Sequence, residues 1–180
     1  MAVREIVKLP DKKLPPDQQL RRKSDPVRYI DAEIRKLVGD MFDTMYKAPG
    51  IGLAAIQVDV AWRVITMDLS KKGNHKERQV FINAEIIWKS DEKVTNEEGC
   101  LSIPEQYEAI ERSARVKAKY LDLDGTEHEI EADGLLATCL QHEIDHTKGI
   151  LFIDHLSRLK RELFMKRYKK FIKTAKKPEA

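Results

Sequence analysis

Residues 142–146 read HEIDH, and this pentapeptide constrains the chain more than any other feature. Two histidines four positions apart stand one turn apart on the same face of an α-helix, where they can bind one metal ion together. Glu143 follows the first histidine and is placed to move protons beside such an ion. The alternative is a pair of hydrogen-bonded core histidines. On a mostly apolar helix, however, uncompensated His and Glu are costly to bury, so the pattern favours a metal site.

A metal-binding pair needs a third protein ligand, and the sequence leaves several candidates open. Phe152 occupies the position where a third histidine completes some HExxH sites. Cys100 offers a soft thiolate that suits zinc or iron, although a single cysteine is more often a small core residue. Glu162 lies in a Lys/Arg-rich tail, where an ion pair with Arg158 or Lys166 explains it more simply. The other candidates are His75, His128 and His155.

Length and composition point to one soluble globular domain. The chain has 180 residues, of which 42% are hydrophobic and 35% charged, so it can bury a core and does not read as disordered. Its first ten residues contain no apolar signal segment, and no apolar run approaches the length of a membrane span. We therefore expect a cytoplasmic protein with no membrane partner, in which Cys100 and Cys139 are reduced thiols. The lack of a transit-like N-terminus favours a bacterial source.

The net charge of +3 is unevenly distributed along the chain. From His155 onward, ten Lys or Arg stand against two Glu, whereas the rest of the chain has 23 basic and 28 acidic residues. Residues 155–180 are therefore predicted to form a basic, amphipathic C-terminal helix. Its apolar positions at helical spacing are Leu156, Leu159, Leu163 and either Phe164 or Tyr168. Either this helix is simply solvated, or it faces nucleic acid or the ribosome, to which clustered basic charge binds.

The remaining pattern predicts an α+β fold and not alternating βαβ units. Asp31 is expected to cap a helix that runs through Tyr46, and Asp133 to cap the helix that carries HEIDH, which Gly149 then ends. Strands are predicted at 62–69, 79–88, 114–123 and 127–131, with turns at 71–77 and 122–127. The first two dozen residues, which include Pro10, Pro15 and Pro16, read as extended or looped.

Three motifs together resemble those of peptide deformylase: GIGLAAIQ at 50–57, EGCLS at 98–102 and QHEIDH at 141–146. Each is weak alone, but their common order and spacing are specific, and the resemblance extends from about residue 31 to the basic tail. It implies a single catalytic domain over residues 1–180. It also implies antiparallel sheets packed around a central helix that bears the HExxH residues, with a C-terminal helix at 155–180.

The resemblance also implies a reaction and a metal. The protein would be a metal-dependent hydrolase that removes the formyl group from the N-terminal methionine of newly made polypeptides and releases formate. Cys100, His142 and His146 would bind one divalent ion, leaving a fourth position open, so the third ligand would not be needed at Phe152. Fe²⁺ is the usual ion of the family, and Zn²⁺, Ni²⁺ or Co²⁺ can take its place.

The family's catalytic and substrate-binding roles fall on further positions of this sequence. Glu143 would move the proton, while the Gln57 side chain and the Leu101 backbone N–H would stabilise the charge that develops on the formyl oxygen. The implied substrate-binding positions are Ile51, Gly52, Glu98, Gly99, Leu135 and Cys139. Ile51, Leu135 and Cys139 would form the methionine pocket. The two glycines would pair with the substrate backbone, and an ion pair with Arg112 would hold Glu98.

Two positions depart from the pattern, and two other functions stay open. Tyr107 stands where many bacterial members of the family have Arg, and Thr138 where an aliphatic residue is expected. Both bear on the preference for substrate residues beyond methionine. A metallopeptidase would use Glu162 or His155 as third ligand and would keep its metal when Cys100 is changed to serine. A ribosome- or RNA-binding protein with a structural metal would show no turnover.

In a deformylase, the basic tail would serve to reach nascent chains at the ribosome. We expect deletion after about Leu156 to spare activity on short peptides and to weaken ribosome binding.

Overall fold

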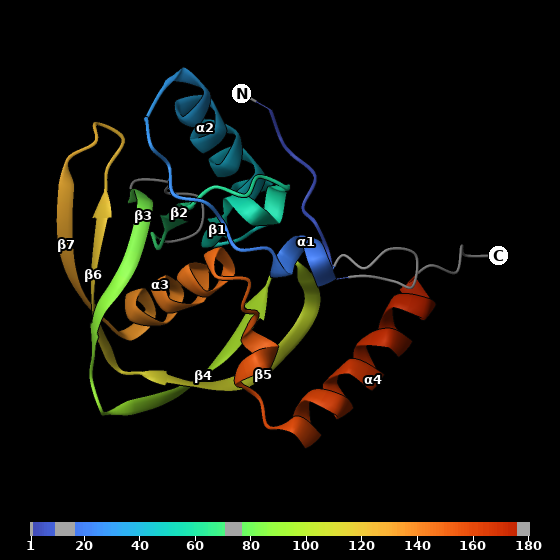
Figure 1. Cartoon of the computed structure of the whole chain (residues 1–180). Helices are drawn as coiled ribbons and strands as arrows, with labels where there is room; N and C mark the ends of the chain where they lie inside the picture. Colours follow the sequence, from blue (N-terminus) through green and yellow to red (C-terminus); the bar gives the residue numbers. More distant parts are fainter. Residues whose placement is uncertain (1, 10–16, 71–76, 176–180) are drawn as a thin grey trace.

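The computed structural model describes residues 2–9, 17–70 and 77–175, and it shows antiparallel sheets arranged around one central helix (Figure 1). Its α-helices are α1 (Asp17–Arg21), α2 (Ala32–Lys47), α3 (Gly134–Thr147) and α4 (Arg158–Ala175). Its strands are β1 (Gly52–Ala54), β2 (Val64–Asp68), β3 (Arg78–Lys89), β4 (Lys93–Cys100), β5 (Ile103–Ser113), β6 (Arg115–Leu121) and β7 (Glu127–Asp133). Two short 3₁₀ helices are η1 (Ala55–Val58) and η2 (Phe152–His155).

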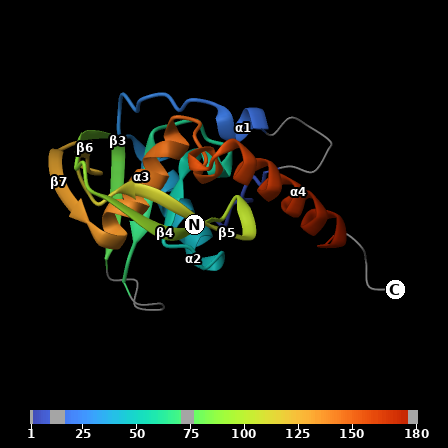
Figure 2. The ribbon, with the colours of Figure 1, turned by 90° about the horizontal axis from the view of Figure 1, so that it is seen from below.

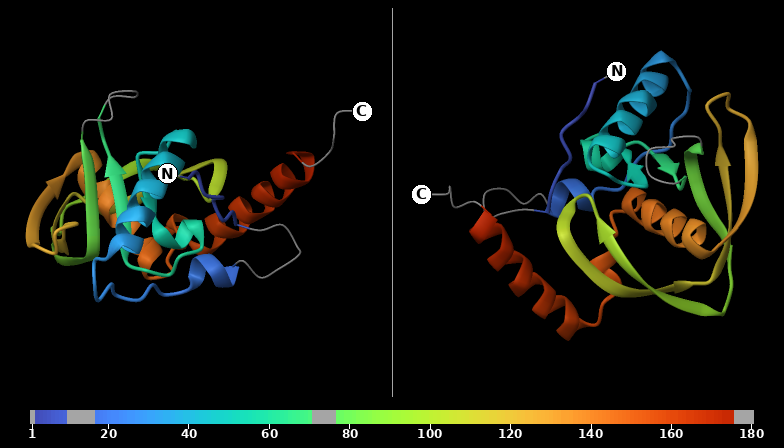
Figure 3. Two further views of the ribbon diagram at one scale, coloured as in Figure 1. Left: turned by 90° about the horizontal axis from the view of Figure 1, so that it is seen from above. Right: turned by 180° about the vertical axis from the view of Figure 1, so that it is seen from behind.

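The strands form two sheets that enclose α3. Five strands pair antiparallel in the order β1-β2-β3-β6-β7, and β4 and β5 form a separate hairpin. Seen from behind, α3 lies in the space between the β4–β5 hairpin and the larger sheet (Figure 3). This arrangement confirms the predicted α+β class and the central position of the helix that carries HEIDH.

The four predicted strands are present, whereas β1, β4 and β5 were not predicted. The reason is visible in β4, whose residues KVTNEEGC are half of them exposed and show no alternation of apolar and polar positions. Strand prediction depends on that alternation. The predicted turn between β6 and β7 is confirmed. The extended or looped structure predicted for the first two dozen residues is wrong at α1, which is helical. Residues 10–16 and 71–76, which include the candidate ligand His75 and most of the turn predicted at 71–77, lie outside the described residues.

The two predicted caps have different outcomes. Asp31 caps α2, since its side chain accepts a hydrogen bond from the backbone N–H of Ile34 at 3.0 Å. Asp133 stands before α3 but its side chain makes no capping bond, so that prediction is wrong. The chain passes directly from β7 into α3 through Gly134, which has a φ of +50°. The other end follows prediction, because Gly149 takes a φ of +75° just after α3.

Helix α4 confirms the predicted C-terminal helix but buries a different face. It begins at Arg158, after His155 has ended η2, and it projects from the side opposite β6 and β7 (Figure 2). Phe164 and Tyr168 are 1% and 2% exposed, whereas Leu159 and Leu163 are 67% and 56% exposed. The two aromatic residues therefore anchor the helix, and the two leucines predicted to share its apolar face lie on the surface.

Deletion after Leu156 would thus remove two aromatic side chains from the core together with the basic surface. Such a deletion therefore changes the core and the basic surface together, and its expected effects on activity and ribosome binding stay predictions. None of the helices in the described part of the chain combines the length and apolarity needed to cross a bilayer.

The contrast on α4 gives a stability test on neighbouring residues. We expect Phe164→Ala to lower the free energy of unfolding by about 3–5 kcal/mol, since it leaves a cavity in the core. Leu163→Ala, the matched control, should change it by about 0.5 kcal/mol or less because its side chain is already in water. Urea denaturation of both variants measures the difference, and equal losses would contradict the orientation of α4.

Candidate metal centre

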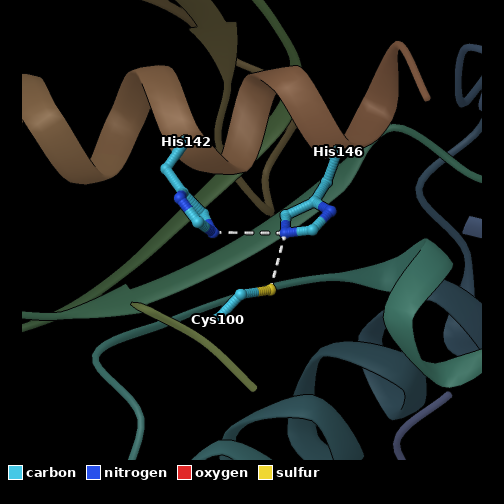
Figure 4. Close-up of side chains that lie close together, drawn as sticks. All are labelled: Cys100, His142 and His146. Atoms are coloured by element: carbon cyan, nitrogen blue, oxygen red, sulfur yellow. Dashed lines mark hydrogen bonds between the residues drawn. The ribbon is translucent and has the colours of Figure 1, made fainter. Parts of the chain in front are cut away.

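Three metal-ligating side chains converge in the interior, one from β4 and two from α3 (Figure 4). The Cys100 Sγ lies 3.3 Å from the His146 Nε2, which lies 3.2 Å from the His142 Nε2. All three donor atoms lie within 4.8 Å of one another. In a tetrahedral site with metal–nitrogen and metal–sulfur distances of ~2.0 and ~2.3 Å, neighbouring donors are about 3.3–3.6 Å apart. The observed spacing therefore fits a single metal ion.

The end of the β4–β5 hairpin directs Cys100 toward α3. Gly99 pairs with Tyr107, but Cys100 pairs with Ile103, so the ladder shifts register between the last two residues of β4. Leu101 and Ser102 form the turn that follows. This irregularity bends the strand end and re-aims its side chain, and the thiol comes to lie opposite one turn of α3.

The electrostatics of the cluster favour a bound cation. Burial opposes ionisation of Cys100, but the neighbouring His146 and His142 outweigh it and lower the thiol pKa to about 5. Burial likewise opposes a charge on His142, yet Cys100 and Glu98 prevail and raise the pKa of that imidazole. In the described part of the chain, the buried His146 Nδ1 has no hydrogen-bond partner. Two imidazoles and a thiolate in this arrangement form a donor set suited to zinc or iron.

A buried network orients His142. Its Nδ1 lies 2.9 Å from the Glu98 Oε2, and the Arg112 guanidinium donates to both oxygens of the same carboxylate, at 2.5 and 2.9 Å. Arg112 also donates to Asp145 at 2.8 Å, and Asp145 lies 2.8 Å from the His155 Nε2. The expected Arg112–Glu98 pair is confirmed. A carboxylate hydrogen-bonded to Nδ1 leaves the Nε2 lone pair free to bind a metal. The Glu98 side chain therefore orients His142.

The other candidate third ligands are engaged elsewhere. His128 lies 2.7 Å from Asp122 on the β6–β7 hairpin, and His155 pairs with Asp145. Glu162 accepts a hydrogen bond from Arg158 on the exposed side of α4, as the sequence suggested. The described residues therefore bring only Cys100 to the two histidines. Sequence reasoning missed the contact of Arg112 with Asp145 and that of Asp145 with His155, because no spacing in the sequence points to either pair.

Phe152 has a packing role at the position of the absent histidine. Its ring stacks on His142 with centroids 6.2 Å apart, and it meets Phe164 edge-on at 5.9 Å. Phe164 in turn stacks on Tyr168 at 6.1 Å. A series of aromatic rings in contact therefore connects the three metal-ligating residues to α4.

Glu143 and Gln57 lie beside the three donors and are 4% and 1% exposed. A Cβ on Gly52 would lie 2.5 Å from the Glu143 Oε1, so only glycine allows this approach. Burial raises the pKa of Glu143, although His142 and His146 oppose it. The Gln57 Oε1 accepts from the Ala54 N–H at 2.9 Å. Its Nε2 lies 3.1 Å from the Ser102 Oγ and 3.5 Å from the Cys100 Sγ, which fixes the amide next to the cluster.

One cleft brings the remaining predicted positions to this site. Ile51 and Leu135 are 43% and 58% exposed at its rim. The other predicted positions that line it are Gly52, Glu98, Gly99, Leu101 and Cys139. Tyr107 and Thr138, the two departures from the motif pattern, also line it, as does the N-terminal segment 3–8. No sequence signal pointed to that segment.

Comparison with known proteins decides the family. A model of the family described as "Polypeptide deformylase" matches residues 3–162. The chain belongs to the polypeptide deformylase family. It is 56% identical over 177 residues to the peptide deformylase of Afipia carboxidovorans, covering 98% of this chain and 100% of that protein. It is 58% identical over 179 residues to the one of Bradyrhizobium sp. strain ORS 278, covering 97% and 99%.

Solved deformylase structures agree with the fold. The crystal structure of a peptide deformylase from Legionella pneumophila matches with a TM-score of 0.87 and 44% identity, covering 98% of this chain and 100% of that one. A peptide deformylase from Ehrlichia chaffeensis in complex with actinonin matches with a TM-score of 0.83 and 42% identity, covering 94% and 98%.

Membership in the family confirms the reaction expected from the three motifs. The protein is a metal-dependent deformylase that removes the N-terminal formyl group from nascent formyl-methionine peptides. A metallopeptidase and a non-catalytic RNA-binding protein, the two alternatives left open by the sequence, do not fit this assignment.

The two cysteines provide a test of the donor set. We expect Cys100→Ser to weaken metal binding by more than about 100-fold. Loss of a residue that only hydrogen-bonds to a metal ligand already lowers metal affinity roughly 10- to 100-fold. Cys139→Ser is the matched control, because burial raises the pKa of that thiol and keeps it neutral. Metal analysis after chelator competition measures both. Full metal content in Cys100→Ser would rule out Cys100 as a ligand.

Proposed function

We propose that residues 1–180 act as one catalytic domain in which Cys100, His142 and His146 hold a single divalent ion, Fe²⁺ in the cell. The observation that carries this proposal is the convergence of the three donor atoms within 4.8 Å, next to a buried glutamate. Zn²⁺, Ni²⁺ and Co²⁺ suit the same imidazole and thiolate ligands. When bound, such an ion supplies Lewis-acid polarisation and lowers the pKa of water toward ~7.

Glu143 is proposed as the general base and then the general acid. Its Oε2 has no hydrogen-bond partner among the described residues, and burial raises its pKa toward the range in which a carboxyl both accepts and returns a proton. It would take a proton from the attacking water and deliver it to the methionine nitrogen as the carbon–nitrogen bond breaks. Formate and a free amino terminus are then the products. Such catalysis contributes roughly 10² to 10⁴ in rate.

Gln57 and Leu101 are proposed to stabilise the charge on the formyl oxygen. The Gln57 Nε2 is a donor beside the cluster, held by the bonds that its amide makes to Ala54 and Ser102. The Leu101 N–H follows Cys100 directly in the turn. Donors held in place before the reaction are most effective, because they need no reorganisation as charge develops.

The cleft is proposed to bind the substrate as an extended strand. β1 is the edge of the five-stranded sheet, and β4 pairs only with β5 among the described strands. Main-chain groups of Gly52 and Gly99 can therefore pair with a peptide between them. The methionine side chain would enter the pocket lined by Ile51, Leu135 and Cys139, with His142 as part of its wall. Glu98 would contribute through the orientation of His142.

The outer face of α4 is proposed to bring the enzyme to ribosomes in the cytoplasm. Its exposed residues include Lys160, Lys166, Lys169, Lys170 and Lys173. A nascent chain leaves the ribosome, whose RNA is a polyanion. Clustered lysines raise the local concentration of a polyanionic partner.

The acid–base role predicts the behaviour of one carboxylate variant. Glu143→Ala should lower kcat by roughly 10²- to 10⁴-fold while it still holds one metal ion, because its oxygens are not among the three donors. Formate release from formyl-Met-Ala-Ser is the measurement, with protein purified without oxygen and loaded with Fe²⁺ or Ni²⁺. Glu162→Ala, at an exposed glutamate of α4, should keep full activity. Turnover by Glu143→Ala within tenfold of the parent would exclude this role.

The ribosome proposal can be tested without removing α4. Charge reversal at Lys166, Lys169 and Lys173 should weaken ribosome co-sedimentation at least about tenfold near 0.1 M salt, because these contacts are electrostatic. Activity on formyl-Met-Ala-Ser should be unchanged, since the three side chains point to solvent.

A matched control carries the same change in net charge elsewhere on the surface. It reverses three other exposed lysines, namely Lys23, Lys89 and Lys148. Equal losses of ribosome affinity in both triple variants would show that total charge matters and that α4 has no special role.

A further inference from the structure

Tyr168 joins the C-terminal helix to the N-terminal segment. Its side chain is 2% exposed, and its hydroxyl donates a hydrogen bond to the Leu9 carbonyl at 3.2 Å. Burial and the nearby Cys100 raise the pKa of Tyr168 to about 12, so the hydroxyl remains a donor at neutral pH. Leu9 is itself 3% exposed. A buried carbonyl needs such a partner, because leaving it unpaired is costly.

Leu9 leads directly to the proposed oxyanion donors. Its N–H donates to the Ser102 carbonyl at 2.8 Å, next to Leu101 in the hairpin turn. The Ser102 hydroxyl accepts the bond from the Gln57 Nε2 at 3.1 Å. Two positions earlier, the Val7 N–H donates to the Gln57 carbonyl at 2.8 Å. The N-terminal segment thus holds Gln57 and the hairpin turn together, and Tyr168 holds the segment.

The Tyr168 ring is fixed independently of its hydroxyl. It stacks on Phe164 and on Phe171, with ring centroids 6.1 and 6.4 Å apart. Phe164 in turn contacts Phe152, whose ring stacks on His142. Removal of the hydroxyl alone should therefore leave the ring and the helix where they are. This separates the effect of one hydrogen bond from that of packing.

We propose that Tyr168 is a positioning residue for the deformylation reaction, acting through Leu9 and Ser102 on the Gln57 amide. The inference rests on the proposed role of Gln57. Its physical basis is that a preorganised donor works only at the place where charge develops, and small displacements are costly in rate. A residue that merely filled the core would change stability and leave kcat alone.

The test is Tyr168→Phe in the metal-loaded enzyme, with Tyr29→Phe as the matched control. Tyr29 is 81% exposed and loses the same atom. With formyl-Met-Ala-Ser, we expect kcat of Tyr168→Phe to fall roughly 3- to 10-fold, a fraction of the loss on removing an oxyanion donor. KM should stay within twofold, because the pocket and the strand edges are untouched. In a Gln57→Ala background, Tyr168→Phe should cause no further loss.

A second readout does not depend on turnover. In the zinc-loaded, ¹⁵N-labelled protein, the side-chain amide signals of Gln57 should shift in Tyr168→Phe and stay in place in Tyr29→Phe. Unchanged signals together with an unchanged kcat, or losses that add to those of Gln57→Ala, would overturn the positioning role. If Gln57→Ala itself kept full kcat, the proposed role of Gln57 would fail, and the amide signals would still report whether Tyr168 orients it.

Discussion

The requirement that the charges on α3 be compensated in the interior shapes the rest of the structure. The helix is buried over most of its surface and carries two histidines and a glutamate. Such groups are tolerated inside a protein only with partners. From the β4–β5 hairpin, Glu98 pairs with His142 and Arg112 pairs with Asp145, and the Glu98 and Arg112 side chains are each 3% exposed. The hairpin must therefore close over α3, and this closure also carries Cys100 to its place.

Close backbone approach at the GIGLAAIQ motif completes the cleft. A Cβ on Gly50 would lie 2.6 Å from the Leu101 side chain, and one on Gly52 would meet Glu143. Because these two positions have no side chain, the loop before β1 can contact the hairpin turn while β1 itself contacts the helix. The small residues of this motif thus determine how near the proposed donors and the proposed base can be to each other.

The sequence predicted the parts of the fold that have a strong local signal. Helix α2 with its Asp31 cap and strands β2, β3, β6 and β7 follow from apolar periodicity and turn residues. The hairpin β4–β5 did not, because β4 is mostly polar and is held by its partner strand and by Arg112. The buried face of α4 was assigned in part to Leu159 and Leu163, since spacing alone cannot say which apolar residues meet a core.

The candidate site, like the fold, could be predicted from the sequence only in part. The two histidines and Glu143 could be placed by helical spacing, whereas Cys100 stayed one candidate among five until the motifs were considered together. The rest consists of long-range contacts: the pairing of Arg112 with Asp145, the stacking of Phe152 on His142, and the N-terminal wall of the cleft. A single sequence contains no signal for them, because each depends on how separate elements come together in space.

The bond between Tyr168 and Leu9 joins residues 159 positions apart in the chain. A growing polypeptide can therefore make this contact only after every element from α1 to η2 has been synthesised. Until then the N-terminal segment lacks its partner on α4, however early the sheets assemble. The order of synthesis thus places completion of this corner of the cleft after synthesis of the strands of both sheets.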